Sequence, residues 1–301
     1  MAADTGTHRG TTVDAGHPAE EPVTADPAGP ATAPGGSRRR TSQRLLRPLK
    51  NQRARRAIGS LIVGAVLWEL TARWAENPLF FPPLTDIWGR FLTLAGDGTL
   101  AENLAASFQE YGWGFLAAVL IGGGLGVLMA ASRFARDVLD PWVTMLNATP
   151  VIALAPLFIV IFGLGLSSKI AIVFLVMLFP ILLNTFIGLS NTDDDLVEAI
   201  RSYGAKGGQI YAKVKLPMAL PQIVAGLRLA LSHGLVGVVV SEFFGARAGI
   251  GMMIFTSAQT FDTNALYVGV IILGLTGVVL TYALLAVERR LARWRFQKEA
   301  S

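Results

Sequence analysis

The chain has 301 residues, of which 52% are hydrophobic and only 16% are charged, and its mean hydropathy is +0.50. A soluble domain carries about 25% charged residues, so this composition excludes an ordinary soluble protein and favours an integral membrane protein. There is no cysteine, which excludes disulfides, thiolate metal sites and cysteine nucleophiles, and with only three histidines no metal site is expected.

The first 57 residues differ in composition from the rest. Residues 1–37 are rich in Pro, Ala, Gly and Thr, and nine Lys and Arg residues follow between Arg38 and Arg56. We therefore expect residues 1–57 to form a disordered basic cytoplasmic tail and 58–301 to form the transmembrane domain. Alternatively, the Lys and Arg residues of this segment bind a lipid or a nucleic acid. No secretory signal is predicted, because the first apolar run begins only near Ile58.

Six apolar segments are long enough to cross a membrane as helices. They cover residues 58–75, 108–131, 142–162, 169–189, 223–243 and 266–287. Cations gather in the tail, at 132–141, at 190–222 and after 287, whereas the other connections hold almost none. The positive-inside rule then places both termini in the cytoplasm, and the net charge of +5 reports topology rather than a nucleic-acid partner.

Local features refine this picture. In the outer connection Thr85 is a candidate N-cap for an amphipathic helix over 86–94. The spacing Gly122-x-x-x-Gly126 favours close approach of another helix. Prolines 150, 156 and 180 are expected to bend the third and fourth spans.

The cytoplasmic connection at 190–222 is unusually long. Thr192 or Asp193 can cap a short helix, and the glycines from Gly204 onward permit a bend. A second short helix is expected to end at Pro217. A helix pair this short cannot bury its apolar stripe alone, so it must pack on a partner or on the underside of the bundle.

Few ionisable groups are expected inside the spans. Glu69 and Arg73 have the spacing of a local ion pair, and Glu69 and Glu242 are the acids that we associate with spans. His233 and Glu242 are nine residues apart, which puts them on opposite helix faces and excludes a relay within one helix. Glu242 is assigned a structural role at an outer gate or dimer contact.

The candidate residues of a solute pathway or gate are Asn147, Asn184, His233 and Glu242. Asn184 is expected to bond across helices, and Asn147 lies near the expected solute path. No cluster of catalytic side chains at one depth is found, so no catalytic residue is predicted. A phosphate-binding loop needs a Gly-Lys pair, which this chain lacks, so any ATP must be bound by another polypeptide.

The long connection resembles the EAA loop of ABC-importer permeases. Glu198-Ala199-Ile200, three residues, Gly204, nine residues and Val214-x-Leu216-Pro217 match its spacing. Further fragments between residues 77 and 287 are similar to the nitrate, sulfonate and taurine branch: Asp140-Pro141, Phe162-Gly-Leu-Gly, Phe179 to Asn184, Ala225 to Ala230, and Glu242-x-x-Gly245-Ala-x-x-Gly249-x-Gly251. Asn147-Ala-Thr-Pro150 departs from the Arg-Pro-x-Pro of that branch, in the span near the expected solute path.

This resemblance implies an all-α permease with six spans per chain and a core region at about 101–287. It further implies a homodimer in the cell membrane, two ATPase subunits that bind ATP and Mg²⁺, and an external solute-binding protein. The coupling loop would be Glu198, Ala199, Ile200, Gly204, Val214, Leu216 and Pro217. The solute would be a small anion such as a sulfonate, taurine or nitrate.

Three alternatives remain. A sister ABC importer would share the fold and carry an osmoprotectant, methionine, a thiamine precursor or an aromatic acid. An ion-driven secondary transporter would need paired intramembrane acids or inverted repeats, which we do not find. A membrane-embedded enzyme would need the catalytic cluster that is missing.

Overall fold

The computed structural model describes residues 42–75 and 79–291, with side chains from 55 to 288 outside the gap. The described residues are helical and contain no strand. The elements are α1 (Ser42–Trp74), α2 (Leu84–Gly96), α3 (Thr99–Ala131), α4 (Arg133–Ala148), the 3-10 helix η1 (Val151–Leu154), α5 (Ala155–Phe162), α6 (Leu166–Ser190), α7 (Asp194–Ser202), α8 (Gly207–Ile210), the π-helix η2 (Tyr211–Lys215), α9 (Leu216–Phe243), α10 (Ile250–Gln259) and α11 (Thr263–Leu291).

The chain divides into two units, residues 1–58 and 59–301, and all contacts given below lie within the second. Of the tail expected at residues 1–57, residues 1–41 lie outside the described residues. α1 begins at Ser42, within the expected tail and before the first apolar segment.

Five of the described helices are long and apolar enough to cross a membrane, and a sixth span is formed if a bent pair of helices is counted as one. The all-α, multi-span fold class is thereby confirmed. The five single-helix spans are all longer than predicted, most of all the two in which α3 begins at Thr99 and the helix containing α9 begins at Gly207.

The prediction that residues 142–162 form one continuous helical span is wrong. The chain turns by 88° between Arg133–Ala148 and Val151–Phe162. Thr149 has extended backbone angles, as expected before Pro150, whose ring and missing N–H cannot continue the helix. The connection expected at 132–141 is instead helical, since the Ser132 hydroxyl accepts a hydrogen bond from the Ala135 N–H and caps α4.

The other two prolines do not end helices. Pro156 lies in the first turn of α5, where its missing N–H has no helical partner to lose. Pro180 lies inside α6, which continues on both sides of it.

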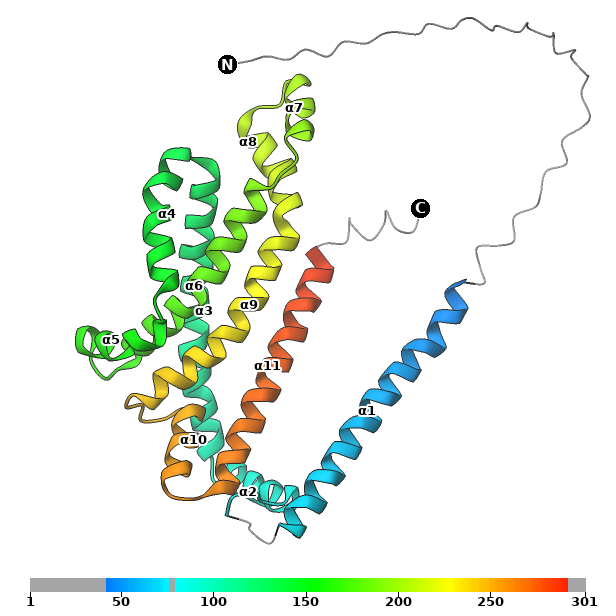
Figure 1. The fold of residues 1–301 in the computed structure, drawn as a ribbon, viewed down its shortest axis with the longest axis vertical. Helices are drawn as coiled ribbons and strands as arrows, with labels where there is room; N and C mark the ends of the chain where they lie inside the picture. Colours follow the sequence, from blue (N-terminus) through cyan, green and yellow to red (C-terminus); the bar gives the residue numbers. More distant parts are fainter. Residues whose placement is uncertain (1–41, 76–78, 292–301) are drawn as a thin grey trace, which may run out of the picture. The chain divides into compact units, whose positions relative to one another are not determined.

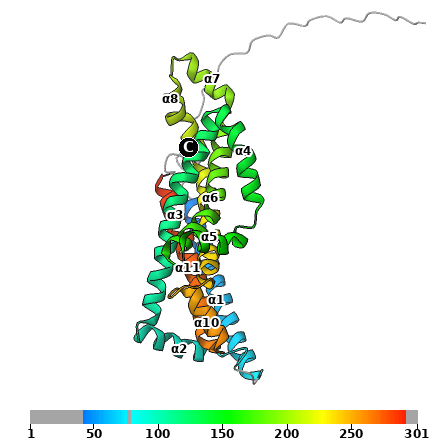
Figure 2. The same cartoon turned by 90° about the vertical axis from the view of Figure 1, so that its left-hand side faces the viewer.

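The centre of the bundle is built from α3, α6 and α9, with α6 packed against both of the others (Figures 1 and 2). Their close approach depends on glycine. A Cβ added at Gly122 would lie 3.0 Å from the Leu178 carbonyl oxygen, and one at Gly126 would lie 2.7 Å from the Leu182 carbonyl oxygen. The predicted close approach at Gly122-x-x-x-Gly126 is confirmed, and its partner is α6.

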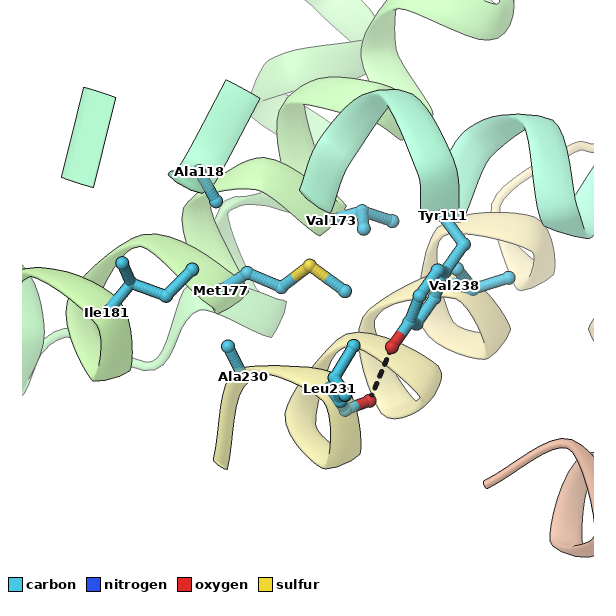
Figure 3. Close-up of a cluster of buried hydrophobic side chains, with 8 residues drawn as sticks. All are labelled: Tyr111, Ala118, Val173, Met177, Ile181, Ala230, Leu231 and Val238. Atoms are coloured by element: carbon cyan, nitrogen blue, oxygen red, sulfur yellow. Dashed lines mark hydrogen bonds between the residues drawn. The ribbon is translucent and has the colours of Figure 1, made fainter. Parts of the chain in front are cut away.

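A buried cluster joins the same three helices (Figure 3). It contains Tyr111, Ala118, Val173, Met177, Ile181, Ala230, Leu231 and Val238. The only polar atom of these side chains is satisfied, because the Tyr111 hydroxyl donates to the Leu231 carbonyl oxygen at 2.9 Å. Tight van der Waals packing of this kind holds helices together where surrounding lipid is as apolar as the interior.

The amphipathic helix predicted over 86–94 is confirmed as α2, but Thr85 does not cap it. Its hydroxyl donates instead to the Glu69 carboxylate at 3.1 Å, and the N-cap position is Pro83. The predicted ion pair of Glu69 with Arg73 is confirmed at 2.7 Å. These contacts tie the end of α1 to the start of α2.

Candidate functional site

The α6–α9 connection carries a short helix that stands beyond the ends of α6 and α9. Figures 1 and 2 both show α7 and α8 at that end of the molecule. Asp193, not Thr192, caps α7, because its carboxylate accepts from the Asp195 N–H at 3.0 Å. The Thr192 hydroxyl donates to the Leu189 carbonyl oxygen and thereby belongs to the end of α6.

Gly204 makes the bend after α7. Its φ of +82° is accessible to glycine and strained for other residues, and a Cβ there would have open space around it. Glycines 207 and 208 have no such angle and lie in the first turn of α8. The bend therefore depends on one glycine.

The second predicted short helix does not end at Pro217. Residues 207–243 form one long helix that passes through a π turn, in which the Leu216 N–H donates to the Tyr211 carbonyl oxygen five residues back. Pro217 follows that turn and lies in the first turn of α9. The widened turn accommodates the proline, so the helical backbone continues from α8 through η2 into α9.

The seven predicted coupling residues lie along this connection, and their exposure differs. Glu198, Ala199, Gly204 and Leu216 are exposed, Ile200 and Pro217 are half-buried, and Val214 is buried. Tyr203, beside the bend, is 94% exposed. The surface of α7 and the bend is thus free in this chain, while Val214 packs against the chain itself.

At the other end of α9, Glu242 holds the start of α10. Glu242 is completely buried, and its carboxylate accepts hydrogen bonds from the Gly251 N–H, the Met252 N–H and the Ser107 hydroxyl. Those N–H groups belong to the first turn of α10 and have no partner within the helix. Glu242 therefore acts as a remote cap that joins α9 and α10.

Residues of α3 complete this arrangement. The Ser107 hydroxyl oxygen accepts from the Ile250 N–H at 2.8 Å, and the Asn103 side-chain oxygen accepts from the Gly249 N–H at 2.7 Å. A Cβ at Gly251 would lie 2.7 Å from a carboxylate oxygen of Glu242, and one at Gly249 would overlap the same carboxylate. The spacing Gly249-x-Gly251 thus leaves room for a buried carboxylate.

The other three pathway candidates are separate from Glu242 and from one another. Asn184 accepts from the Gln222 amide at 2.9 Å, a bond between α6 and α9. Asn147 is exposed in the last turn of α4, and His233 is exposed on the face of α9 that also carries Val236. No hydrogen bond joins any two of Asn147, Asn184, His233 and Glu242 in the part of the chain that the structure describes.

A buried ion pair is present that the sequence patterns did not predict. Glu110 of α3 is 2% exposed, and its carboxylate lies 3.2 Å from the Lys169 ammonium of α6. The Ser241 hydroxyl of α9 donates to the same carboxylate at 3.4 Å. Glu110 and Lys169 have opposite charges and lie at the predicted outer ends of two spans. This placement in the sequence could have indicated the ion pair. The association of only Glu69 and Glu242 with spans was wrong.

No group of three or more His, Asp or Glu side chains able to hold a metal ion occurs among the described residues. The long apolar helices, the proline-bent pair and the protruding α7 define a polytopic helical membrane protein with a short exposed helix in the connection between two spans.

Comparison with known proteins then identifies the family. The family model described as "Binding-protein-dependent transport system inner membrane component" matches residues 122–296, more than half of the chain. The chain belongs to this family and is the inner-membrane permease of a binding-protein-dependent ABC importer.

Several curated relatives match most of the chain. It is 32% identical to the taurine transport system permease protein TauC of Escherichia coli, over 79% of this chain and 89% of TauC. It is 37% identical to a putative aliphatic sulfonates transport permease protein SsuC of Bacillus subtilis, over 68% of this chain and 74% of that protein. It is 30% identical to the formylaminopyrimidine transport permease protein ThiX of Halalkalibacterium halodurans, over 76% and 92%.

A solved structure supports the fold. The chain superposes on an inward-facing conformation of the MetNI methionine ABC transporter with a TM-score of 0.51 and 22% identity, covering 64% of this chain and 96% of that one. As a permease the chain is a non-catalytic membrane subunit that carries no cofactor. ATP is bound by an ATPase subunit, and a binding protein delivers the solute.

Proposed function

We propose that this permease imports small organosulfonates of the taurine and alkanesulfonate type. The relatives named for taurine and aliphatic sulfonates support this substrate class. The protruding α7 and its bend at Gly204 support coupling of import to the ATPase through residues 192–217.

The coupling element works as a rigid lever in this proposal. α7 sits in a cleft of the ATPase and moves with it when ATP binds, with Glu198 and Ala199 on its exposed surface. Because α8 and α9 form one long helix, a push on the bend is carried along α9 toward Glu242. Rigid-body motion of packed helices is a common way to transmit such a change.

We further propose that both termini are cytoplasmic and that the permease is a homodimer. The clustering of cations in alternate connections supports the orientation. Exposure of Asn147 and His233 in the single chain supports a solute path formed between two copies, because side chains that line such a path would be uncovered in one copy alone.

Gly204→Trp tests the coupling role. The bulky residue cannot adopt a φ of +82° without strain, so the bend should shift while the membrane helices remain inserted. We expect at least about a tenfold loss of ATPase association, equivalent to about 1.4 kcal/mol, and loss of uptake. Co-purification of the ATPase and solute uptake measure these effects. Gly96→Trp, at an open position in α2, is the matched control; unchanged uptake in the Gly204 variant would refute the lever.

Competition between solutes tests the substrate class. The complete importer in proteoliposomes, supplied with ATP and labelled taurine, should show saturable uptake that excess ethanesulfonate suppresses. Excess methionine or formylaminopyrimidine should leave it unchanged. Suppression by formylaminopyrimidine, or absence of taurine uptake from a complex with active ATPase, would replace the sulfonate assignment with that of a sister importer.

A further inference from the structure

A cavity of about 440 Å³ opens between three elements at the predicted outer side of the membrane. Its walls come from α3, from the start of α6 and from the α9–α10 connection. The lining residues used below are Gln109, Glu110, Leu166, Lys169 and Arg247. This volume lies within the range of about 300–1,000 Å³ usual for small-molecule sites.

The charge in this cavity is unbalanced. Lys169 and Arg247 contribute two cations, and Glu110 contributes one carboxylate. The Glu110 carboxylate is already engaged by Lys169 and by the Ser241 hydroxyl. Arg247 is exposed and has neither an ion pair nor a side-chain hydrogen bond to any residue that the structure describes. The Arg247 guanidinium is therefore free to bind a ligand.

The remaining lining suits an anion with a short apolar part. The N-terminus of α6, which has no side-chain cap, forms one wall, and its backbone N–H groups favour negative charge. The Arg247 guanidinium can donate two parallel hydrogen bonds to an oxyanion, which an ammonium group cannot do. Leu166 offers apolar surface, and Gln109, from α3, adds a polar amide to the lining.

We infer that this cavity, which we call the outer anion pocket (Gln109, Glu110, Leu166, Lys169 and Arg247), receives the sulfonate group of the solute on its way into the bundle. Arg247 binds the oxyanion directly. The ion pair with Glu110 holds Lys169 at the pocket wall as a second cation. This assignment rests on the proposed sulfonate function for the identity of the ligand, but the preference for anions rests on the pocket alone.

The cysteine-free sequence permits a direct test of the local charge. Gln109→Cys puts a single thiol in the pocket wall, and Ala101→Cys puts one at an exposed position earlier in the same helix as a control. The full-length permease, in complex with its ATPase in phosphatidylcholine nanodiscs, is treated with sulfonatoethyl or trimethylammonioethyl methanethiosulfonate. These reagents share their chemistry and differ in the sign of their charge.

We expect the ratio of anionic to cationic labelling rates to be about tenfold higher at position 109 than at position 101, because a cationic cleft concentrates anions. Adding Arg247→Gln should remove most of this preference, and Arg247→Lys should preserve it. Free taurine should slow labelling at position 109 only. Equal ratios at the two positions, or a preference that survives Arg247→Gln, would overturn the pocket.

Two further arms separate the possible failures. A lipid phosphate could offer the same anionic chemistry, so protection by phosphatidylglycerol but not by taurine would overturn the solute assignment. Taurine uptake by the unmodified importer without any labelling preference would refute the pocket alone. A labelling preference without taurine protection or taurine uptake would refute the sulfonate function and, with it, the proposed ligand.

Discussion

Replacing Glu242 with alanine is expected to destabilise the permease by about 3 kcal/mol. The variant leaves the buried Gly251 N–H and the part-buried Met252 N–H without an acceptor, and a buried donor that loses its acceptor costs about 1–3 kcal/mol. The loss also frees the first turn of α10 from α9. We therefore expect faster hydrogen exchange at residues 249–252 in addition to lower overall stability.

The matched control for this prediction is Glu69→Ala. Glu69 is likewise a carboxylate that accepts hydrogen bonds, but its side chain is 22% exposed and that of its partner Arg73 is 61% exposed, so water can replace the lost contacts and we expect a much smaller loss of stability than for Glu242→Ala. Unfolding of both variants in mixed micelles by increasing sodium dodecyl sulfate, followed by circular dichroism, gives the comparison. Equal losses in the two variants would contradict a capping role for Glu242.

Gly126→Ala is expected to lower stability by about 1–3 kcal/mol, although alanine is the better helix former. The added Cβ would lie 2.7 Å from the Leu182 carbonyl oxygen and 2.8 Å from the Thr185 Cβ, so α3 and α6 must move apart. Overpacking of a tight interface costs about this amount. A rigid backbone atom is the nearest neighbour, which leaves no side-chain rotation to relieve the overlap.

Gly123→Ala on the same helix is the control, and its expected effect on stability has the opposite sign. Nothing lies within 4 Å of a Cβ at Gly123, so only the gain in helix propensity, about 1 kcal/mol, should be seen. The two variants compared in the same micelle unfolding assay should therefore shift in opposite directions. A stabilised Gly126 variant would show that the α3–α6 contact is looser than these distances indicate.

Features that depend on near neighbours in sequence were predicted well. The Glu69–Arg73 pair follows from helix geometry, the close approach at Gly122 and Gly126 from two small residues on one face, and the bend at Gly204 from one permissive residue. The end of α8 was mispredicted, because a π turn lets the helix continue past Pro217. The exposed positions of Asn147 and His233 leave their role in a solute path a prediction.

The apolar segments and the distribution of cations indicate by themselves a helical membrane protein, and the spacing from Glu198 to Pro217 indicates a permease through its resemblance to the EAA loop. These signals are local, because each depends on the residues of one segment: on whether they favour lipid or water, and on whether they favour a helix. Tertiary structure alone decided which polar groups meet: Ser107 and Glu242 are 135 residues apart, and Glu110 reaches Lys169 and Ser241 from a different helix. A charge buried in an apolar bundle is costly unless it is paired. Which residue pairs with it depends on how the helices pack, and the sequence of a single segment does not determine that packing.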